Sequence, residues 1–138
     1  IIEQNACVSG AEGGCQAECG AAAAMAAGAL TELAGGSPEE VVQGATLAIK
    51  NLLGLACDPV AGLVEVPCVK RNGVLAAYSF IAAEMALAGI KSEIPPDEVI
   101  EAMYRIGRMM PAAIRETAEG GLATTGTGMK WKKRIEEA

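Results

Sequence analysis

The feature that most constrains this fold is a run of small apolar residues, "CGAAAAMAAGAL", at positions 19 to 30. Small side chains let neighbouring helices approach closely, but each buries little area, at about 25 cal/mol per Å². Hydrophobic residues make up 51% of the chain, whereas aromatic residues make up only 3%. We therefore expect a close-packed but thin core that a partner completes.

The remaining pattern predicts an all-α domain, a compact helical unit of about four to six helices with a long apolar loop containing cysteine and proline. The first helix is expected over residues 15–34, where a glycine pair stops it. "SPEE" at 37–40 predicts the next helix, because Ser37 can cap it and Glu40 completes a capping box. That helix should end around Gly54.

Two further helices and a tail complete the predicted organisation. A third helix is expected from about Asn72 to Ala88, and "IPPDE" opens a fourth that Pro111 kinks or breaks. The domain is expected to span residues 1–123. Residues 124–138, "TTGTGMKWKKRIEEA", are expected to form a polar tail that is loosely ordered or docked on something outside this chain.

Charge and hydropathy exclude several classes of partner. The net charge is −6, which argues against nucleic acid. The longest apolar run, Ala21 to Leu30, is shorter than the ~20 residues of a membrane span. Five cysteines form no evident disulfide framework, so we expect a reducing, cytoplasmic location with thiols free or bound to metal. The chain begins at Ile1, so we expect an excerpt or trimmed product.

The segment "SGAEGGCQAECG" at positions 9 to 20 places a cysteine at a predicted helix start. Cys15 follows Gly13 and Gly14, where free N–H groups and the helix dipole favour a thiolate. The glycines are expected to let the backbone approach a bound group closely. Cys19, one helical turn later, is expected to be a packing residue, as is Cys7.

A second segment, "LACDPVAGLVEVPCVK" at 55–70, places Cys57 and Cys68 on an apolar loop stiffened by proline. An apolar loop must satisfy its backbone polar groups, and such a loop usually wraps a site. Three thiols held on stiff backbone would suit an iron-sulfur cluster with one open iron. The familiar ferredoxin and zinc-knuckle spacings are absent, so buried structural cysteines and a zinc site remain open alternatives.

Three separated motifs carry a resemblance to a known family: "SGAEGGCQAECGAAAAMAAGAL", "LGLACDPVAGLVEVPCVKRN" and "ETAEGGLA". From residue 5 to about 123 the chain resembles the C-terminal half of the alpha chain of iron-sulfur L-serine dehydratases. The resemblance implies an all-helical domain with a [4Fe-4S] cluster and no pyridoxal phosphate. The cysteines of the GCQ, CDP and VPC motifs, Cys15, Cys57 and Cys68, would be its ligands, with the fourth iron left for substrate.

Polar residues beside these cysteines are candidates for substrate contacts. Asp58 is either a catalytic group or a turn residue before a proline. Arg71 and Asn72 are either part of a carboxylate clamp or a solvated helix start. Glu12 and Glu18 either bind a substrate ammonium group or are first-turn acids favoured by the helix dipole.

The resemblance also implies an activity and partners: conversion of L-serine to pyruvate and ammonia, a beta chain or domain, and a homo- or hetero-oligomer. The chain contains no histidine, so the catalytic base is expected outside it, and this segment alone is expected to be inactive. It also lacks the C-terminal cysteine of some family members. Two alternatives remain: a cysteine desulfidase on the same scaffold, or an inert helical assembly module with buried cysteines.

Overall fold

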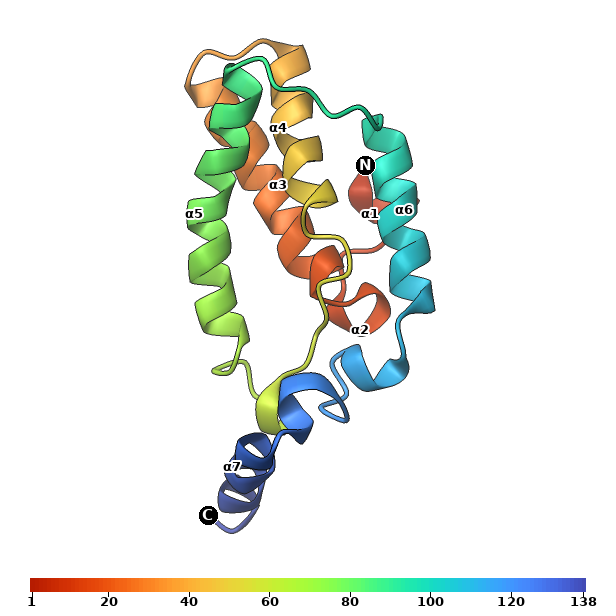
Figure 1. Cartoon of the computed structure of the whole chain (residues 1–138), viewed down its shortest axis with the longest axis vertical. Helices are drawn as coiled ribbons and strands as arrows, with labels where there is room; N and C mark the ends of the chain where they lie inside the picture. Colours follow the sequence, from red (N-terminus) through yellow and green to blue (C-terminus); the bar gives the residue numbers. More distant parts are fainter.

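Four long helices carry the fold, and a computed structural model describes all residues from 1 to 138. The long helices run side by side along the main axis (Figure 1) and are α3 (Cys15–Leu33), α4 (Pro38–Lys50), α5 (Cys68–Leu87) and α6 (Pro96–Met109). Shorter elements are α1 (Ile2–Asn5), α2 (Gly10–Gly13), the 3-10 turns η1 (Val60–Gly62), η2 (Ala112–Ile114) and η3 (Gly121–Thr124), and α7 (Gly126–Glu136). No strand forms, so the all-α prediction is confirmed.

The main core lies between the long helices and is built largely from small side chains. Its buried members are Ala24, Ala27, Leu47, Ala48, Ile49, Ala82, Ala86, Val99, Ile100 and Met103. Close approach of α3 and α4 depends on Gly44, because a Cβ there would lie 2.7 Å from the Thr31 Oγ1 atom. The predicted close packing of a thin, alanine-rich core is thus observed.

Local sequence signals set most of the helix ends. Ser37 and Glu40 form the predicted capping box, with the Ser37 hydroxyl accepting from the Glu40 N–H. The fourth long helix ends at Met109, two residues before Pro111. Helix α5, however, begins at Cys68 rather than at the expected Asn72, so this cysteine lies on a helix and not in the loop.

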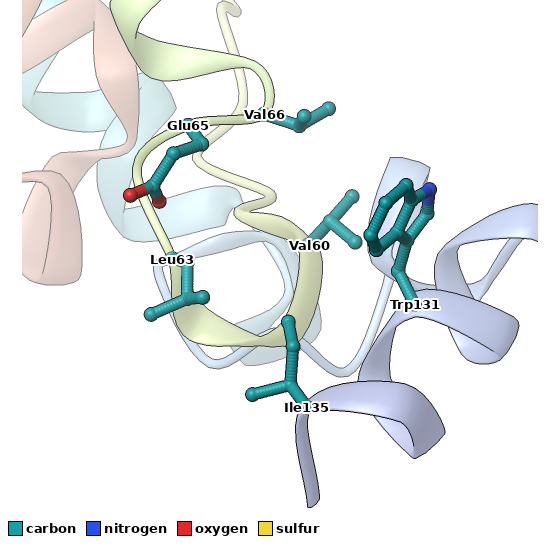
Figure 2. A pocket seen from close by; sticks show the side chains of 6 residues that line it. All are labelled: Val60, Leu63, Glu65, Val66, Trp131 and Ile135. Carbon is teal, nitrogen blue, oxygen red and sulfur yellow. The ribbon is translucent and has the colours of Figure 1, made fainter. Parts of the chain in front are cut away.

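The C-terminal segment differs from its prediction as a loosely ordered or externally docked tail. Residues 126–136 form α7, and the Thr125 hydroxyl caps it by accepting from the Gly128 N–H at 3.1 Å. Two apolar side chains one turn apart, Trp131 and Ile135, face the turn around η1 (Figure 2). The polar composition of the segment concealed this apolar pair.

The opposing wall of that contact comes from the proline-rich loop. Its side chains are Val60, Leu63, Glu65 and Val66. Helix α7 thereby packs on the loop that carries the CDP and VPC motifs, away from the four long helices (Figure 1). None of the helices combines the length and apolar character that a bilayer crossing requires.

Candidate metal centre

Two buried thiols meet where α3 begins, the end of that helix next to α2 (Figure 1). Cys15 is the first residue of α3, and Cys57 lies in the loop after α4; they are 0% and 2% exposed. Together with Glu18, they present ligand atoms that all lie within 4.8 Å of one another. Cys19 packs beside them in a small core cluster with Leu75. The structure therefore brings together two of the three predicted cysteine ligands.

The third predicted ligand, Cys68, lies at the first position of α5 and is partly exposed. Its thiol is outside the closest group of ligand atoms. It is still near enough for the charge of Cys15 to act with burial in raising the pKa of Cys68. Two of the thiols thus lie at helix N-termini, where the dipole favours bound anions.

Glycine allows the first cysteine to approach the loop. Gly14 has φ = 76°, and a Cβ on it would lie 2.6 Å from the Met110 sulfur. A Cβ on Gly13 would lie 2.7 Å from the Cys7 sulfur. Both glycines predicted beside Cys15 therefore occupy tight positions, and their role toward a cofactor stays a prediction.

Gln16 is a buried residue of the site that sequence analysis missed. Its side-chain amide donates to the Met103 carbonyl at 2.8 Å and accepts from the Gly54 N–H at 3.0 Å. Its own backbone N–H donates to the Leu55 carbonyl at 3.0 Å. These bonds fix the start of α3 against α6 and against the loop that follows α4. The only available signal was the position of Gln16 directly after Cys15.

The loop carrying Cys57 is held by the segment that contains the "ETAEGGLA" motif. The Cys57 N–H donates to the Ile114 carbonyl at 2.9 Å, and the Glu116 N–H donates to the Cys57 carbonyl at 2.8 Å. This pair of bonds forms the only β-type bridge in the molecule. The segment that contains "ETAEGGLA" therefore positions the loop that carries Cys57, although about sixty residues separate the two in sequence.

Asp58 joins three segments through its two carboxylate oxygens. One oxygen lies 3.3 Å from the Arg71 guanidinium, and the other accepts from the Leu122 N–H at 2.8 Å. Gly121 has φ = 59°, and a Cβ on it would lie 2.5 Å from the carboxylate. The side chain is buried, so both interactions are shielded from water. This geometry makes Asp58 an organiser of the loop, and its catalytic role stays a prediction.

Arg71 is committed to the same loop. It also donates to the Ala56 carbonyl at 2.7 Å. Burial would lower the pKa of Arg71, but the Cys15 thiol and the Asp58 carboxylate outweigh burial and raise it. The guanidinium thus remains charged beside the thiols.

Asn72 lies one residue further along α5. Its side-chain oxygen accepts from the Cys19 thiol at 3.4 Å. Its amide nitrogen makes no hydrogen bond within the chain. The predicted catalytic residues therefore lie around the thiols, and their roles in catalysis stay predictions.

A family model described as "Serine dehydratase alpha chain" matches residues 1–123. The chain belongs to the serine dehydratase alpha chain family. The family resemblance drawn from the three motifs is therefore confirmed.

Known family members are similar over nearly the whole chain. A "Probable L-serine dehydratase, alpha chain" of Bacillus subtilis is 60% identical over 98% of this chain and 45% of its own length. The "L-serine dehydratase, alpha chain" of Peptoniphilus asaccharolyticus is 51% identical over 96% of this chain and 46% of its own. "L-serine dehydratase 1" of Escherichia coli is 49% identical over 89% of this chain and 27% of its own. The chain thus spans about half the length of the alpha chains it matches.

The donor set of this serine dehydratase alpha chain segment fits a thiolate-bound metal group. Burial, and then the charges of Cys15 and Glu116, raise the pKa of Cys57. Burial is also the main reason that the pKa of Cys19 rises to about 12. Because metals bind the thiolate, metal binding here must release protons. Thiolates suit iron-sulfur clusters and zinc, so the residues present fit such a group.

Proposed function

We propose that this chain is the cluster-bearing part of an L-serine ammonia-lyase, which eliminates water from L-serine to give pyruvate and ammonia. The observation that carries the proposal is the meeting of Cys15 and Cys57, together with Glu18, at the start of α3, with Cys68 near enough for Cys15 to affect its pKa. The relatives named L-serine dehydratase support the substrate. The cytoplasm is the proposed location, because a cluster of free thiols suits a reducing compartment.

In this proposal Cys15, Cys57 and Cys68 hold a [4Fe-4S] cluster. The bound cluster would supply a Lewis acid for the serine hydroxyl, which is otherwise a poor leaving group. The protein contributes the placement of these ligands. Asp58 and Arg71 hold the loop that carries Cys57 against α5.

Other residues of the chain would bind and orient the substrate. The Asn72 amide nitrogen has no partner within the chain and can donate to the serine carboxylate. Gly13 and Gly14 allow the backbone at the start of α3 to pack closely on its neighbours, and we propose that they also let it approach the bound cluster. A base must also remove the Cα proton, and we propose that it comes from outside this chain.

The remaining half of an alpha chain and a beta chain or domain are the proposed partners. The chain spans 45% of the Bacillus subtilis alpha chain, and we propose that the active enzyme includes residues beyond this segment. We propose residues 1–123 as the C-terminal half of the alpha domain and residues 124–138 as a separate packing segment on it. We also propose that the enzyme is an oligomer.

The experiment is anaerobic reconstitution of the complete enzyme with iron and sulfide, followed by iron counting. We expect about four irons per chain, lost in Cys15→Ser, Cys57→Ser and Cys68→Ser. The matched control is Cys7→Ser, a buried cysteine outside the site, which should keep its iron.

Substrate tests on the same preparations separate the alternatives. Pyruvate from L-serine, and no sulfide from L-cysteine, is the expected outcome; the reverse preference would favour a desulfidase. Iron retained in all three variants would contradict the ligand assignment. Zinc instead of iron in the purified wild type, or no metal at all, would favour the zinc site or the assembly module.

A further inference from the structure

Glu116, the first residue of "ETAEGGLA", is an acidic side chain at the proposed active site that has no role in the proposed function. We propose that Glu116 binds the ammonium group of the amino acid substrate and so selects amino acids over simple hydroxy acids. This inference rests on the proposed function and deepens it.

The backbone fixes Glu116 directly beside a proposed ligand. Its N–H donates to the Cys57 carbonyl at 2.8 Å, within the bridge that joins the two segments. Its φ is 68°, in the left-handed region that residues other than glycine seldom adopt. The backbone of Glu116 is therefore held in a constrained conformation next to Cys57.

The carboxylate meets the thiol site next to a second acid. A Cβ on Gly10 would lie 3.0 Å from a Glu18 carboxylate oxygen, 3.1 Å from the Cys57 sulfur and 3.4 Å from a Glu116 carboxylate oxygen. Two carboxylates from distant segments therefore lie near the Cys57 sulfur, around the same glycine. The Glu116 charge is also one of the causes that raise the pKa of Cys57.

No cation of the protein lies within ion-pair distance of these two acids. The ion pairs of the chain involve other carboxylates, and neither Glu18 nor Glu116 takes part in one. The nearby guanidinium of Arg71 is committed to Asp58 and a backbone carbonyl. The site therefore combines buried thiols for a metal group with two exposed carboxylates that take part in no ion pair.

The chemistry of an amino acid substrate matches this arrangement. An ammonium group has three donors and one positive charge, and charge-assisted hydrogen bonds to carboxylates are the stronger kind. A hydroxy acid that lacks the amine, such as 3-hydroxypropionate, gains nothing from Glu116. Glu116 would therefore contribute to the affinity for serine and leave that for 3-hydroxypropionate unchanged.

The test compares Glu116→Gln with Glu119→Gln in the complete, iron-loaded enzyme. Glu119 is a matched control because it is exposed on the same segment and is not among the groups around Gly10. Calorimetric titration measures binding of D-serine and of 3-hydroxypropionate, and the KM for L-serine is measured in parallel. We expect Glu116→Gln to weaken serine binding about 10- to 100-fold, the loss of a charged hydrogen bond, with unchanged 3-hydroxypropionate affinity and iron content.

A conservative variant separates charge from structure. Glu116→Asp keeps the carboxylate and should restore most of the preference for serine over 3-hydroxypropionate, whereas a purely structural role would not follow the charge. Equal weakening of both ligands, no change in either, or loss of iron from Glu116→Gln would overturn the assignment. A wild-type enzyme that holds no iron or binds no serine would instead overturn the proposed function, and this inference with it.

Discussion

The two ends of the molecule are stabilised by different kinds of interaction. Between the long helices, the core consists of apolar side chains such as Leu47 and Met103, both about 1% exposed. Around the thiols, buried polar side chains such as Gln16 and Asp58 each join separate segments through hydrogen bonds. The helical core is thus held by burial and the site by directed hydrogen bonds.

The two kinds of interaction contribute differently, one to the stability of the fold and the other to the geometry of the site. Burial of apolar area is nondirectional, so it stabilises the fold without fixing individual atoms. Hydrogen bonds fix distances and angles, and leaving one partner buried and unpaired is costly. Substitutions in the core should therefore change the free energy of unfolding, whereas substitutions around the site should change metal retention first.

The largest expected effect on stability comes from Leu47→Ala. The variant removes a fully buried side chain from the centre of the core and should lower the free energy of unfolding by about 2–5 kcal/mol. Urea denaturation of the full-length alpha chain measures it, with Val42→Ala, a half-exposed position on the same helix, as the control. Iron per folded chain should stay at the wild-type level. A loss of iron equal to that of a cysteine variant would break the distinction between the two ends.

Asp58→Asn should produce a smaller loss of stability but a larger loss of iron. The asparagine side chain carries no charge to face Arg71. Its NH2 group also points a donor at either the Arg71 guanidinium or the Leu122 N–H, both of which are donors themselves. We expect the free energy of unfolding to fall by about 1.5–3 kcal/mol. Glu39→Gln is the control, because its ion pair with Lys91 is exposed and should contribute little to stability. Full iron content in Asp58→Asn would show that the loop does not need this link.

The same contrast explains what sequence could predict. The capping box at Ser37, the start of α3 at Cys15 and the helix end before Pro111 all follow from residues a few positions apart. Local backbone chemistry determines such features, so the helical architecture was accessible. The sequence pattern predicts the start of α5 four residues too late, at Asn72, because it contains no separate signal that Cys68 itself is helical.

Features that join distant segments were not accessible from the sequence. The motifs identified the candidate thiols, but not that Gln16 bonds to α6 or that Glu116 reaches Cys57. These contacts depend on the tertiary arrangement of loops whose backbones have no repeating pattern. The packing of α7 was missed for a similar reason, since Trp131 and Ile135 find their partners in a loop far away in sequence.

The smallest expected effect is a pH dependence of the metal-free chain. Burial is the leading cause that raises the pKa of Cys57, and it raises that of Cys19 to about 12. The unfolded chain loses these protons around pH 8.5–9, while the folded chain keeps them. Folding therefore retains protons that the unfolded state releases, so this stability is fully present near pH 7, declines as the pH approaches and passes about 8.5, and is lost as the pH rises toward 12.

Between pH 7 and pH 8.5 this linkage should lower the free energy of unfolding by about 0.5–1 kcal/mol. Tyr78, whose pKa is also raised by burial, contributes only above about pH 10, so this window isolates the thiols. Urea denaturation at the two pH values measures the effect, and Cys19→Ala should reduce it. Iron loading should remove the part that comes from Cys57, because a bound thiolate no longer takes up protons, and should leave the part that comes from Cys19. A stability that rises over this window would mean that the thiols are held as anions before any metal binds.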